Sequence, residues 1–346
     1  MYEWLAPISN IFKSLLNVIH NVVPSYGWSI IILTIVFRAI LLPLDIKQKV
    51  SMKKQALLQP KIAKINEKYK NDKEKAAQKT MELYKQEKSS PLSGCLPSLI
   101  QLPLFFAFFG ALQIIAGSQL HDLFLTMQGL VTKFGTNPIP VDQLPHLESW
   151  LWVKNVWQPD IFDLKIIPMN ALVIPPFSSV RAFSNFKGVT EQLYTSVMKP
   201  LIDNHSKFYN GLFILPLLAG ASSYLQTKIT MPPQPKTPDP AQQKNPFSSK
   251  TMQYIFPLMS IFFTASSNSI FALYWFTSNL CSVATFWTVD KIWAMNAHKR
   301  EAAEKEKLQA ATQIESAKAA TPAITVEATD AKPAIKKGFS KEGKKK

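Results

Sequence analysis

The stretch IILTIVFRAILLPL, residues 31–44, constrains the fold more than any other feature, because it places one arginine, Arg38, in an otherwise apolar run. With its flanking residues the run reaches about 20 residues, the length of a helix that crosses the hydrocarbon core of a bilayer. A permanent charge at the centre of such a helix costs roughly 2.5–3.5 kcal/mol on insertion scales. The sequence therefore predicts a membrane helix at 26–45 in which Arg38 is compensated by a partner or used by a function.

Four further apolar runs make the alternative, a buried helix of a soluble protein with a surface arginine, the weaker interpretation. The mean hydropathy of +0.02 and the net charge of +16 hide these runs, because lysine-rich segments lie between them. We predict five membrane spans, at residues 26–45, 95–117, 209–230, 251–268 and 269–293. The last two are joined by the polar stretch 266–269 alone, so they are expected to form an antiparallel hairpin.

The basic residues between the spans predict their orientation. Residues 45–94 carry 13 lysines against 6 acidic residues, residues 231–250 carry 3 basic and 1 acidic, residues 290–346 carry 13 and 8, and residues 118–208 carry 7 of each. Loops rich in Lys and Arg stay on the cytoplasmic side of the membrane. We therefore expect the loops 46–94 and 231–250 and the basic tail 294–346 in the cytoplasm, and the loop 118–208 and the N-terminus outside.

The N-terminal residues 1–25 show no pattern of a removable signal peptide but do predict an amphipathic helix. One apolar face collects residues at helical spacing, namely Ile8, Ile11, Phe12, Leu15, Leu16 and Ile19. Such a helix is typical of a segment that lies in the membrane interface, here on the outer surface. The alternative is that the same face packs along a neighbouring span.

The segment 46–94 predicts a helical hairpin. Two apolar stripes, one of Leu58, Ile62, Ile65 and Tyr69 and one of Ala77, Met81 and Tyr84, flank a turn at Asn71 and Asp72. Two antiparallel helices are expected to bury these stripes against each other, with Pro60 kinking or dividing the first helix. The lysines of the hairpin form a solvated face, or they contact anionic lipid heads or ribosomal RNA; the pattern does not choose between these.

Several polar side chains lie at membrane depth in the predicted spans. They are Gln101 in the second span, Gln226 in the third, and Tyr274, Trp275 and Asn279 in the fifth. Such groups form structural contacts between helices, or they line one wet cavity together with Arg38. Pro103 requires protein neighbours for the second span, and the small residues 219–222 allow close approach of another helix to the third.

Four motifs, in this order, resemble the YidC family of membrane protein insertases in its bacterial five-span form. They are TIVFRAILLPLDIKQKVS, SPLSGCLPSLIQLPLFFAFFGAL, LPLLAGASSYLQTKIT and MQYIFPLMSIFFTASSNSIFALYWFTSNL. The resemblance covers residues 8–118 and about 147–293. It implies an all-α polytopic membrane protein of the bacterial cytoplasmic (plasma or inner) membrane. Five transmembrane helices would surround a hydrophilic groove, with a cytoplasmic helical hairpin and an N-terminal interfacial helix.

The resemblance also assigns roles to single residues. Arg38 and Thr34 match groove positions of the first span, and Tyr274 and Trp275 match the groove-facing aromatic pair of the last span. Two apolar residues of the second span, Leu102 and Phe105, match the surface along which a nascent helix slides. The implied function is to move the short hydrophilic tail of a nascent membrane protein through the groove and to release its apolar segment sideways into lipid.

The resemblance implies nascent membrane proteins and the lipid bilayer as partners, and the ribosome and the Sec translocon as further ones. The basic tail suggests ribosome docking through RNA phosphates, or else a solubilising tail that touches lipid without specificity. A rival interpretation is a small anion transporter or channel in which Arg38 binds the anion. Against it stand the single intramembrane charge, no evident internal repeat and the large basic hairpin.

The chain departs from the family pattern in the outer loop, where an insertion covers about 165–207. Its segment IIPMNALVIPPF, residues 166–177, is too short and too rich in proline to span a membrane. We expect no catalytic centre, no metal and no cofactor. Cys95 and Cys281 lack metal-site spacing, the five histidines are scattered, and there is no phosphate-binding GxxxxGK[ST] motif.

Overall fold

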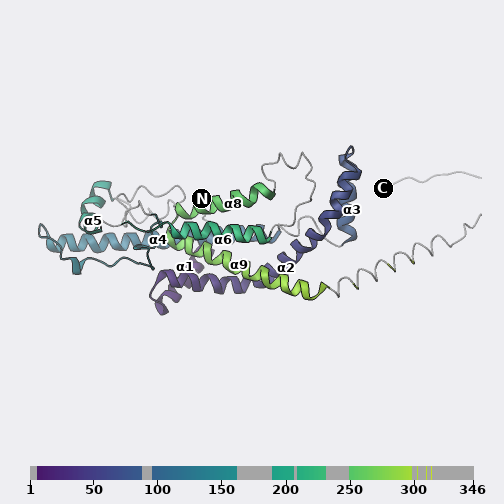
Figure 1. Cartoon of the computed structure of the whole chain (residues 1–346). Helices are drawn as coiled ribbons and strands as arrows, with labels where there is room; N and C mark the ends of the chain where they lie inside the picture. The colour runs from purple at the N-terminus through teal and green to yellow at the C-terminus, as the bar shows by residue number, and fades with distance from the viewer. Residues whose placement is uncertain are drawn as a thin grey trace, which may run out of the picture. The chain divides into compact units, whose positions relative to one another are not determined.

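A computed structural model describes residues 6–87, 96–161, 189–205, 209–230 and 249–297, together with residues 302, 309 and 313. The described part is helical and contains no strand beyond one isolated bridge between Trp150 and Val153 (Figure 1). Its helices are α1 (Ala6–Val22), α2 (Tyr26–Lys68), α3 (Lys73–Gln86), α4 (Leu96–Phe134), α5 (Glu191–His205), α6 (Ile214–Thr230), α8 (Ser249–Ala265) and α9 (Ser269–Met295), with a short 3₁₀ turn, η2 (Val141–Gln143). The chain divides into a unit of residues 1–291 and a second unit of residues 292–346, and the contacts below belong to the first.

Two helices in the described residues are long and apolar enough to cross a membrane. They are α2 and the part of α4 from Pro103 to Phe134. A shorter apolar helix covers Gln253–Ala265 within α8. The all-helical architecture agrees with the predicted fold class, while the number of spans and the groove stay predictions.

Helix α2 is one continuous helix of 43 residues, which joins the predicted first span to the first half of the predicted hairpin. The expected boundary at residue 45 is therefore not a helix end. Pro43 and Pro60 both lie inside the helix, so the idea that Pro60 divides it is wrong. The carbonyl that loses its helical hydrogen bond is that of Ala56, which is partly exposed, so solvent can reach it.

Helices α2 and α3 are joined at the turn that Asn71 and Asp72 predict. The Asp72 carboxylate caps α3 by accepting a hydrogen bond from the backbone N–H of Lys75 at 3.0 Å. The expected burial of the second stripe is wrong, since Ala77 is exposed, Met81 is 48% exposed and α3 has no buried residue. A lone pair of helices covers only one side of each partner, so these side chains stay open to their surroundings.

Helix α4 continues to Phe134, 17 residues beyond the predicted end of the second span at 117. The extension and α5 bury a separate apolar cluster of Phe124, Met127, Leu144, Tyr194, Val197, Met198 and Leu201. Tyr194 stacks on Phe124 with ring centroids 5.9 Å apart, and burial raises the pKa of its phenol well above the ordinary value. The described part of the predicted loop 118–208 thus contains the end of α4, the turn η2 and α5. Residues 166–177 lie outside the described part of the chain.

Helix α1 packs against α4 and α2, and its apolar residues divide between two faces. Phe12 and Leu16 are buried, and Phe12 meets the ring of Phe108 edge to face at 5.2 Å. Ser9 Oγ donates to the carbonyl of Ala107 at 2.7 Å, which fixes α1 on α4. An unburied stripe remains on the other face, formed by Ile11, Leu15, Val18 and Val22. The packing alternative holds for one face, and the membrane-surface position stays a prediction for the other.

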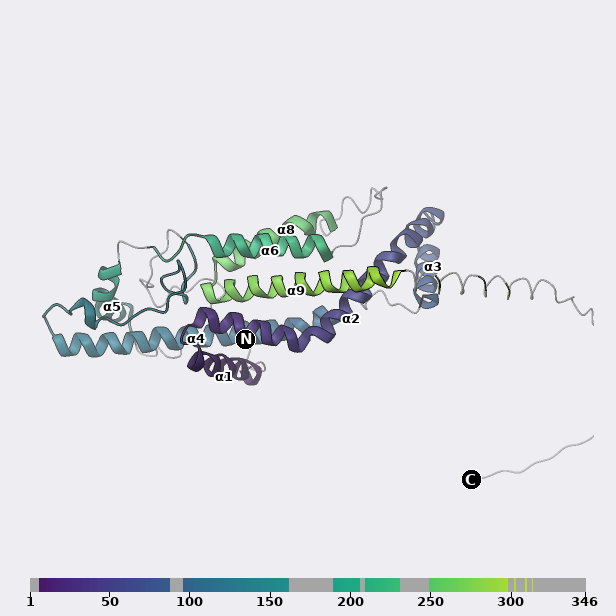
Figure 2. The same ribbon diagram turned by 60° about the horizontal axis from the view of Figure 1, so that its bottom comes forward.

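Helix α8 lies along α6, as both views show, and α9 lies between this pair and α2 (Figure 2). The small residues predicted to allow close approach do so. A Cβ atom at Gly220 would lie 2.4 Å from Ile261 Cγ1 of α8. The link between α8 and α9 is the short turn predicted from the sequence, and the Asn268 side chain caps α9 by accepting from the N–H of Phe271 at 3.0 Å.

Candidate functional site

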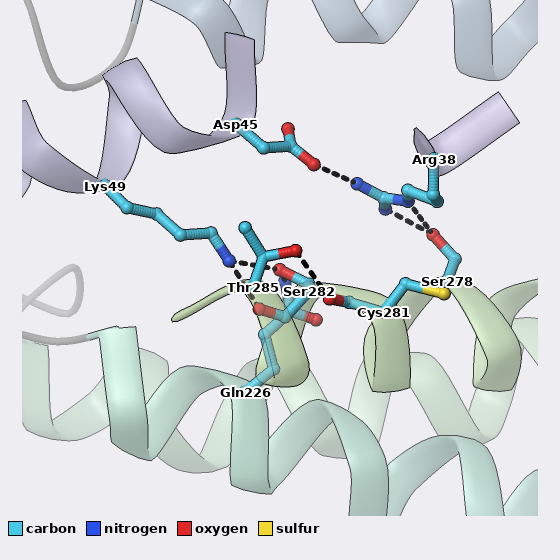
Figure 3. A network of polar contacts seen from close by, with 8 residues as sticks. All are labelled: Arg38, Asp45, Lys49, Gln226, Ser278, Cys281, Ser282 and Thr285. Carbon is cyan, nitrogen blue, oxygen red and sulfur yellow. Dashed lines mark hydrogen bonds and ion pairs between the residues drawn. The ribbon is translucent and has the colours of Figure 1, made fainter. Parts of the chain in front are cut away.

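A polar seam joins one face of α2 to one face of α9. On α2 it consists of Arg38, Asp45 and Lys49. Asp45 and Lys49 follow Arg38 by 7 and 11 residues, so the three share a helix face. On α9 it consists of Ser278 and Ser282, one turn apart. We call these five residues the seam. The two helices meet through these side chains rather than through close backbone packing (Figure 3).

The charge of Arg38 is compensated within the protein. Its Nε donates to Ser278 Oγ at 3.0 Å, and its Nη2 donates to the same hydroxyl. Its Nη1 forms an ion pair with Asp45 Oδ2 at 3.4 Å, and the two side chains are 15% and 8% exposed. The carboxylate of Asp45 on one side and the hydroxyl of Ser278 on the other therefore offset part of the cost of placing a guanidinium in an apolar helix.

Lys49 carries a second cation into the same seam. It is only 4% exposed, and its Nζ donates to the backbone carbonyl and, at 3.1 Å, to the Oγ of Ser282. The same Oγ accepts from Gln226 Nε2 of α6 at 3.3 Å. Nζ also lies 5.5 Å from the centroid of the Phe286 ring, within cation–π range. Gln226 thereby joins the seam to α6.

A second polar cluster connects α9 to α6. Asn279 Nδ2 donates to Ser222 Oγ at 3.1 Å and to Ser223 Oγ at 2.8 Å. Trp275 Nε1 donates to Ser223 Oγ at 3.1 Å. Asn279 is buried, so these contacts satisfy amide and indole groups that would otherwise be costly at this depth. These are contacts between helices, one of the two roles that the sequence left open for such groups, and the role in a wet cavity stays a prediction.

The aromatic residues of the predicted site lie where α9 meets α4. Tyr274 is buried, and its ring centroid lies 4.1 Å from that of Phe108. Phe105 contacts the ring of Trp275 at 5.7 Å between centroids, so one predicted slide residue touches one predicted groove residue. The side chains of Gln101 and Leu102 lie outside the described residues.

The structure brings together only part of the predicted site and adds residues to it. Arg38 and Gln226 reach the same short stretch of α9, whereas Thr34 is buried and donates at 2.6 Å to Ile30 O of its own helix. The predicted site omits Asp45, which is the last residue of the predicted span, and Lys49, which lies beyond its end. Extending the helix face of Arg38 by two and three turns would have found both, since α2 continues without a break.

A second polar region holds the start of α6. We call residues 150–161 and 209–213 the clamp. The buried carboxylate of Asp160 accepts from the backbone N–H groups of Leu212 at 2.7 Å, Phe213 at 3.2 Å and Leu215 at 2.7 Å, and from Trp152 Nε1 at 3.1 Å. It therefore holds Phe213 in a left-handed conformation with φ of 62°, which is unusual for a bulky residue.

The clamp also reaches the starts of α2 and α9. Asn210 accepts from the N–H of Asn155 at 2.7 Å and donates to the carbonyl of Pro159 at 2.8 Å. Ser269 N donates to Gln158 O at 3.0 Å, and Ile270 N donates to Val156 O at 3.2 Å. Two tryptophans of the clamp meet α2: Trp157 packs on Tyr26 at 4.8 Å and Trp150 on Trp28 at 5.6 Å between ring centroids. The first turns of three helices are thus tied together.

Two helices long and apolar enough to cross a membrane, a partly buried and paired arginine, and a clamp over three helix starts are typical of a helical membrane protein. The family described as 60Kd inner membrane protein matches residues 18–297, and the chain belongs to this family. The description of this family and its bacterial relatives support a location of the chain in the bacterial inner membrane.

Three similar relatives carry the name "Membrane protein insertase YidC". The Fusobacterium nucleatum protein is 34% identical over 269 residues, which are 78% of this chain and 88% of that protein. The Campylobacter jejuni protein is 30% identical over 86% of this chain and 40% of its own length, and the Janthinobacterium protein is 29% identical over 84% and 38%. This chain therefore spans less than half the length of two of these relatives. The comparisons do not favour the transporter interpretation.

Proposed function

We propose that this chain is a membrane protein insertase and chaperone. It accepts the short hydrophilic tail of a nascent membrane protein and releases the apolar segment sideways into the lipid. The observation that carries the proposal is the seam, where Arg38 in an apolar helix is bound by one hydroxyl and by a single carboxylate contact. Membership of the 60Kd inner membrane protein family, and the insertase name of the relatives, support the same function.

The proposed topology has five spans around a hydrophilic groove, with the N-terminus outside and the C-terminus in the cytoplasm. The clamp then lies on the outer side, and the seam lies toward the cytoplasmic side, because α2 and α9 both run from the clamp toward the seam. A groove closed outside and polar inside lowers the barrier for moving a polar tail across half of the bilayer. The apolar segment of the substrate passes along Leu102, Phe105 and Trp275 as it enters the lipid.

The driving force in this proposal needs no nucleotide and no bond-breaking step. Burial of an apolar segment of about 20 residues in the bilayer is favourable. The membrane potential adds about 2.3 kcal/mol for each elementary charge moved across 100 mV. An acidic group on the tail is attracted by Arg38, since opposite charges interact more strongly away from bulk water.

The proposed partners are nascent membrane proteins and the lipid bilayer, with the ribosome and the Sec translocon as further ones. The ribosome would contact the hairpin of α2 and α3 and the basic tail 294–346, which carries 12 basic residues. The tail lies almost wholly outside the described residues. Ribosome binding through RNA phosphates is expected to fall steeply as salt is raised.

The test is insertion of a single-span substrate with a short acidic tail into vesicles that contain the purified chain. Protection of the tail from external protease measures insertion. Arg38→Ala should lose most of the protection and Arg38→Lys should keep it, because lysine retains the charge. Lys199→Ala is the matched control, since Lys199 is an exposed cation paired with Asp203 on α5, away from the seam.

Each other outcome has a definite meaning for this proposal. Full protection with Arg38→Ala would contradict the role of the arginine. No protection even with the unmodified chain, combined with flux of a small anion through the vesicle membrane, would contradict the insertase function and support the transporter.

A further inference from the structure

The seam contains two cations and one carboxylate, so it carries one uncompensated positive charge. Asp45 lies on α2 between the other two, seven residues after Arg38 and four before Lys49. Figure 3 shows its carboxylate directed to the Arg38 side, away from the Lys49 ammonium. Within the described part of the chain, Asp45 is the carboxylate that pairs with Arg38.

The contact between Asp45 and Arg38 is a weak form of such a pair. It uses one oxygen and one guanidinium nitrogen, at 3.4 Å. The strongest arginine–carboxylate pairs are bidentate and have distances of about 2.7–2.9 Å. A carboxylate with freer geometry can therefore form a better pair with this guanidinium than the resident one does.

Lys49 is a buried ammonium that meets only neutral acceptors. Its ammonium contacts the carbonyl and hydroxyl of Ser282 and the Phe286 ring, and among the described residues it forms no ion pair. Buried charges are usually paired. An acidic residue four positions before a lysine on a helix is placed to pair with it. Lys49 therefore offers Asp45 a second position one turn along α2.

We propose that Asp45 is an exchangeable counter-ion that moves between Arg38 and Lys49. When no substrate is bound, Asp45 pairs with Arg38. When an acidic side chain of a passing tail binds the guanidinium, Asp45 turns to Lys49, so that each of the two cations keeps a carboxylate. This inference rests on the proposed function, and it makes Asp45 and Lys49 positioning residues that set the preference of the seam for acidic tails.

The exchange has a definite energetic order. In the empty seam Asp45 lies on Arg38, so this position has the lower free energy of the two. Asp45 competes with the acidic tail for Arg38, and its pairing with Arg38 is more favourable than its pairing with Lys49. Removing the carboxylate of Asp45 therefore favours binding of the acidic tail. Removing the charge of Lys49 takes away the second position alone, which matters only while Asp45 is present. The two changes are expected to act in opposite directions and to depend on each other.

The experiment measures equilibrium binding of two fluorescent tail peptides to the full chain in phosphatidylcholine nanodiscs. The peptides are identical except for one Asp in the first and one Asn in the second. The ratio of their affinities is the readout, because both peptides report on the same folded fraction of each sample. The neutral lipid keeps lipid anions from competing for the cations.

We expect Asp45→Asn to raise the preference for the acidic peptide by about tenfold, and Lys49→Gln to lower it by a similar factor. In the Asp45→Asn background, Lys49→Gln should leave the preference unchanged. With Asp45 present, Lys49→Arg should keep the preference of the unmodified chain, because arginine retains the positive charge. Asp290→Asn is the matched control, because Asp290 of α9 pairs with Lys53 of α2 but is largely exposed.

Two results would overturn the exchange. The first is a preference that is unchanged or lowered in Asp45→Asn. The second is an equal effect of Lys49→Gln with and without Asp45, which would mean that Lys49 binds the peptide directly. Insertion that fails while the preferences shift as expected would contradict the proposed function alone, and insertion that succeeds with unshifted preferences would contradict the exchange alone.

Discussion

The clamp and the seam both bury polar groups, but they satisfy them in different ways. In the clamp, Asp160 accepts from three backbone N–H groups and one indole, and Asn210 bonds to backbone atoms of the facing segment. In the seam, Arg38 and Lys49 are held by the rotatable hydroxyls of Ser278 and Ser282, by one weak carboxylate contact and by the Ser282 carbonyl. Most contacts of the clamp end on backbone groups, whereas the contacts of the seam join side chains, apart from the one between Lys49 and the Ser282 carbonyl.

This difference separates stability from function. Backbone groups cannot turn away from a partner without moving the chain, so contacts to them hold helix starts in place. A hydroxyl can turn and a long cationic side chain can change its rotamer, so contacts between them can be exchanged for a passing ligand at little cost. We therefore expect changes in the clamp to affect folding and changes in the seam to affect selectivity.

The largest effect on stability is expected for Asp160→Ala. The change leaves three backbone N–H groups and the Trp152 indole without their acceptor; Leu215 N–H is buried and the other three are partly buried, and an unsatisfied buried group costs about 1–3 kcal/mol. The total exceeds about 3 kcal/mol, which is enough to unfold many proteins. The measurement is the thermal unfolding midpoint in detergent, followed by size-exclusion chromatography. A midpoint equal to that of the unmodified chain would contradict the role given to the clamp.

The sequence predicts some of these contacts between helices and not others. A local run of small residues predicts the close approach at Gly220, and the polar residues 266–269 predict the turn between α8 and α9. The clamp joins Asp160 to residues more than 50 positions away, across a segment with no periodic pattern, so no local signal predicted it. The extension of α4 was missed because Gly117 and Ser118 end the continuous apolar run, although helical spacing continues beyond them.

An intermediate effect is expected for Gly220→Ala, which tests packing without polar groups. The new Cβ would lie 2.4 Å from Ile261 Cγ1, so α6 and α8 must separate, at a cost of about 1–3 kcal/mol. Ile261→Ala in the same chain should recover part of the loss, because it removes the obstructing atoms. Gly129→Ala is the control: no atom lies within 4 Å of its new Cβ, and alanine favours a helix by about 0.5–1 kcal/mol. Equal losses at both glycines would exclude the steric explanation.

The smallest effect on stability is expected for Ser278→Ala, which removes a hydroxyl from the centre of the seam. The guanidinium of Arg38 keeps Asp45 and some solvent access, so the free energy of unfolding should fall by only about 1 kcal/mol. The preference for the acidic over the amide peptide should rise instead, because the hydroxyl no longer competes for the Arg38 donors. The two readouts, an unfolding midpoint and an affinity ratio, are measured on the same preparation. A large drop in the midpoint with an unchanged ratio would mean that the seam holds the fold together as the clamp does, and the separation of stability from selectivity would not stand.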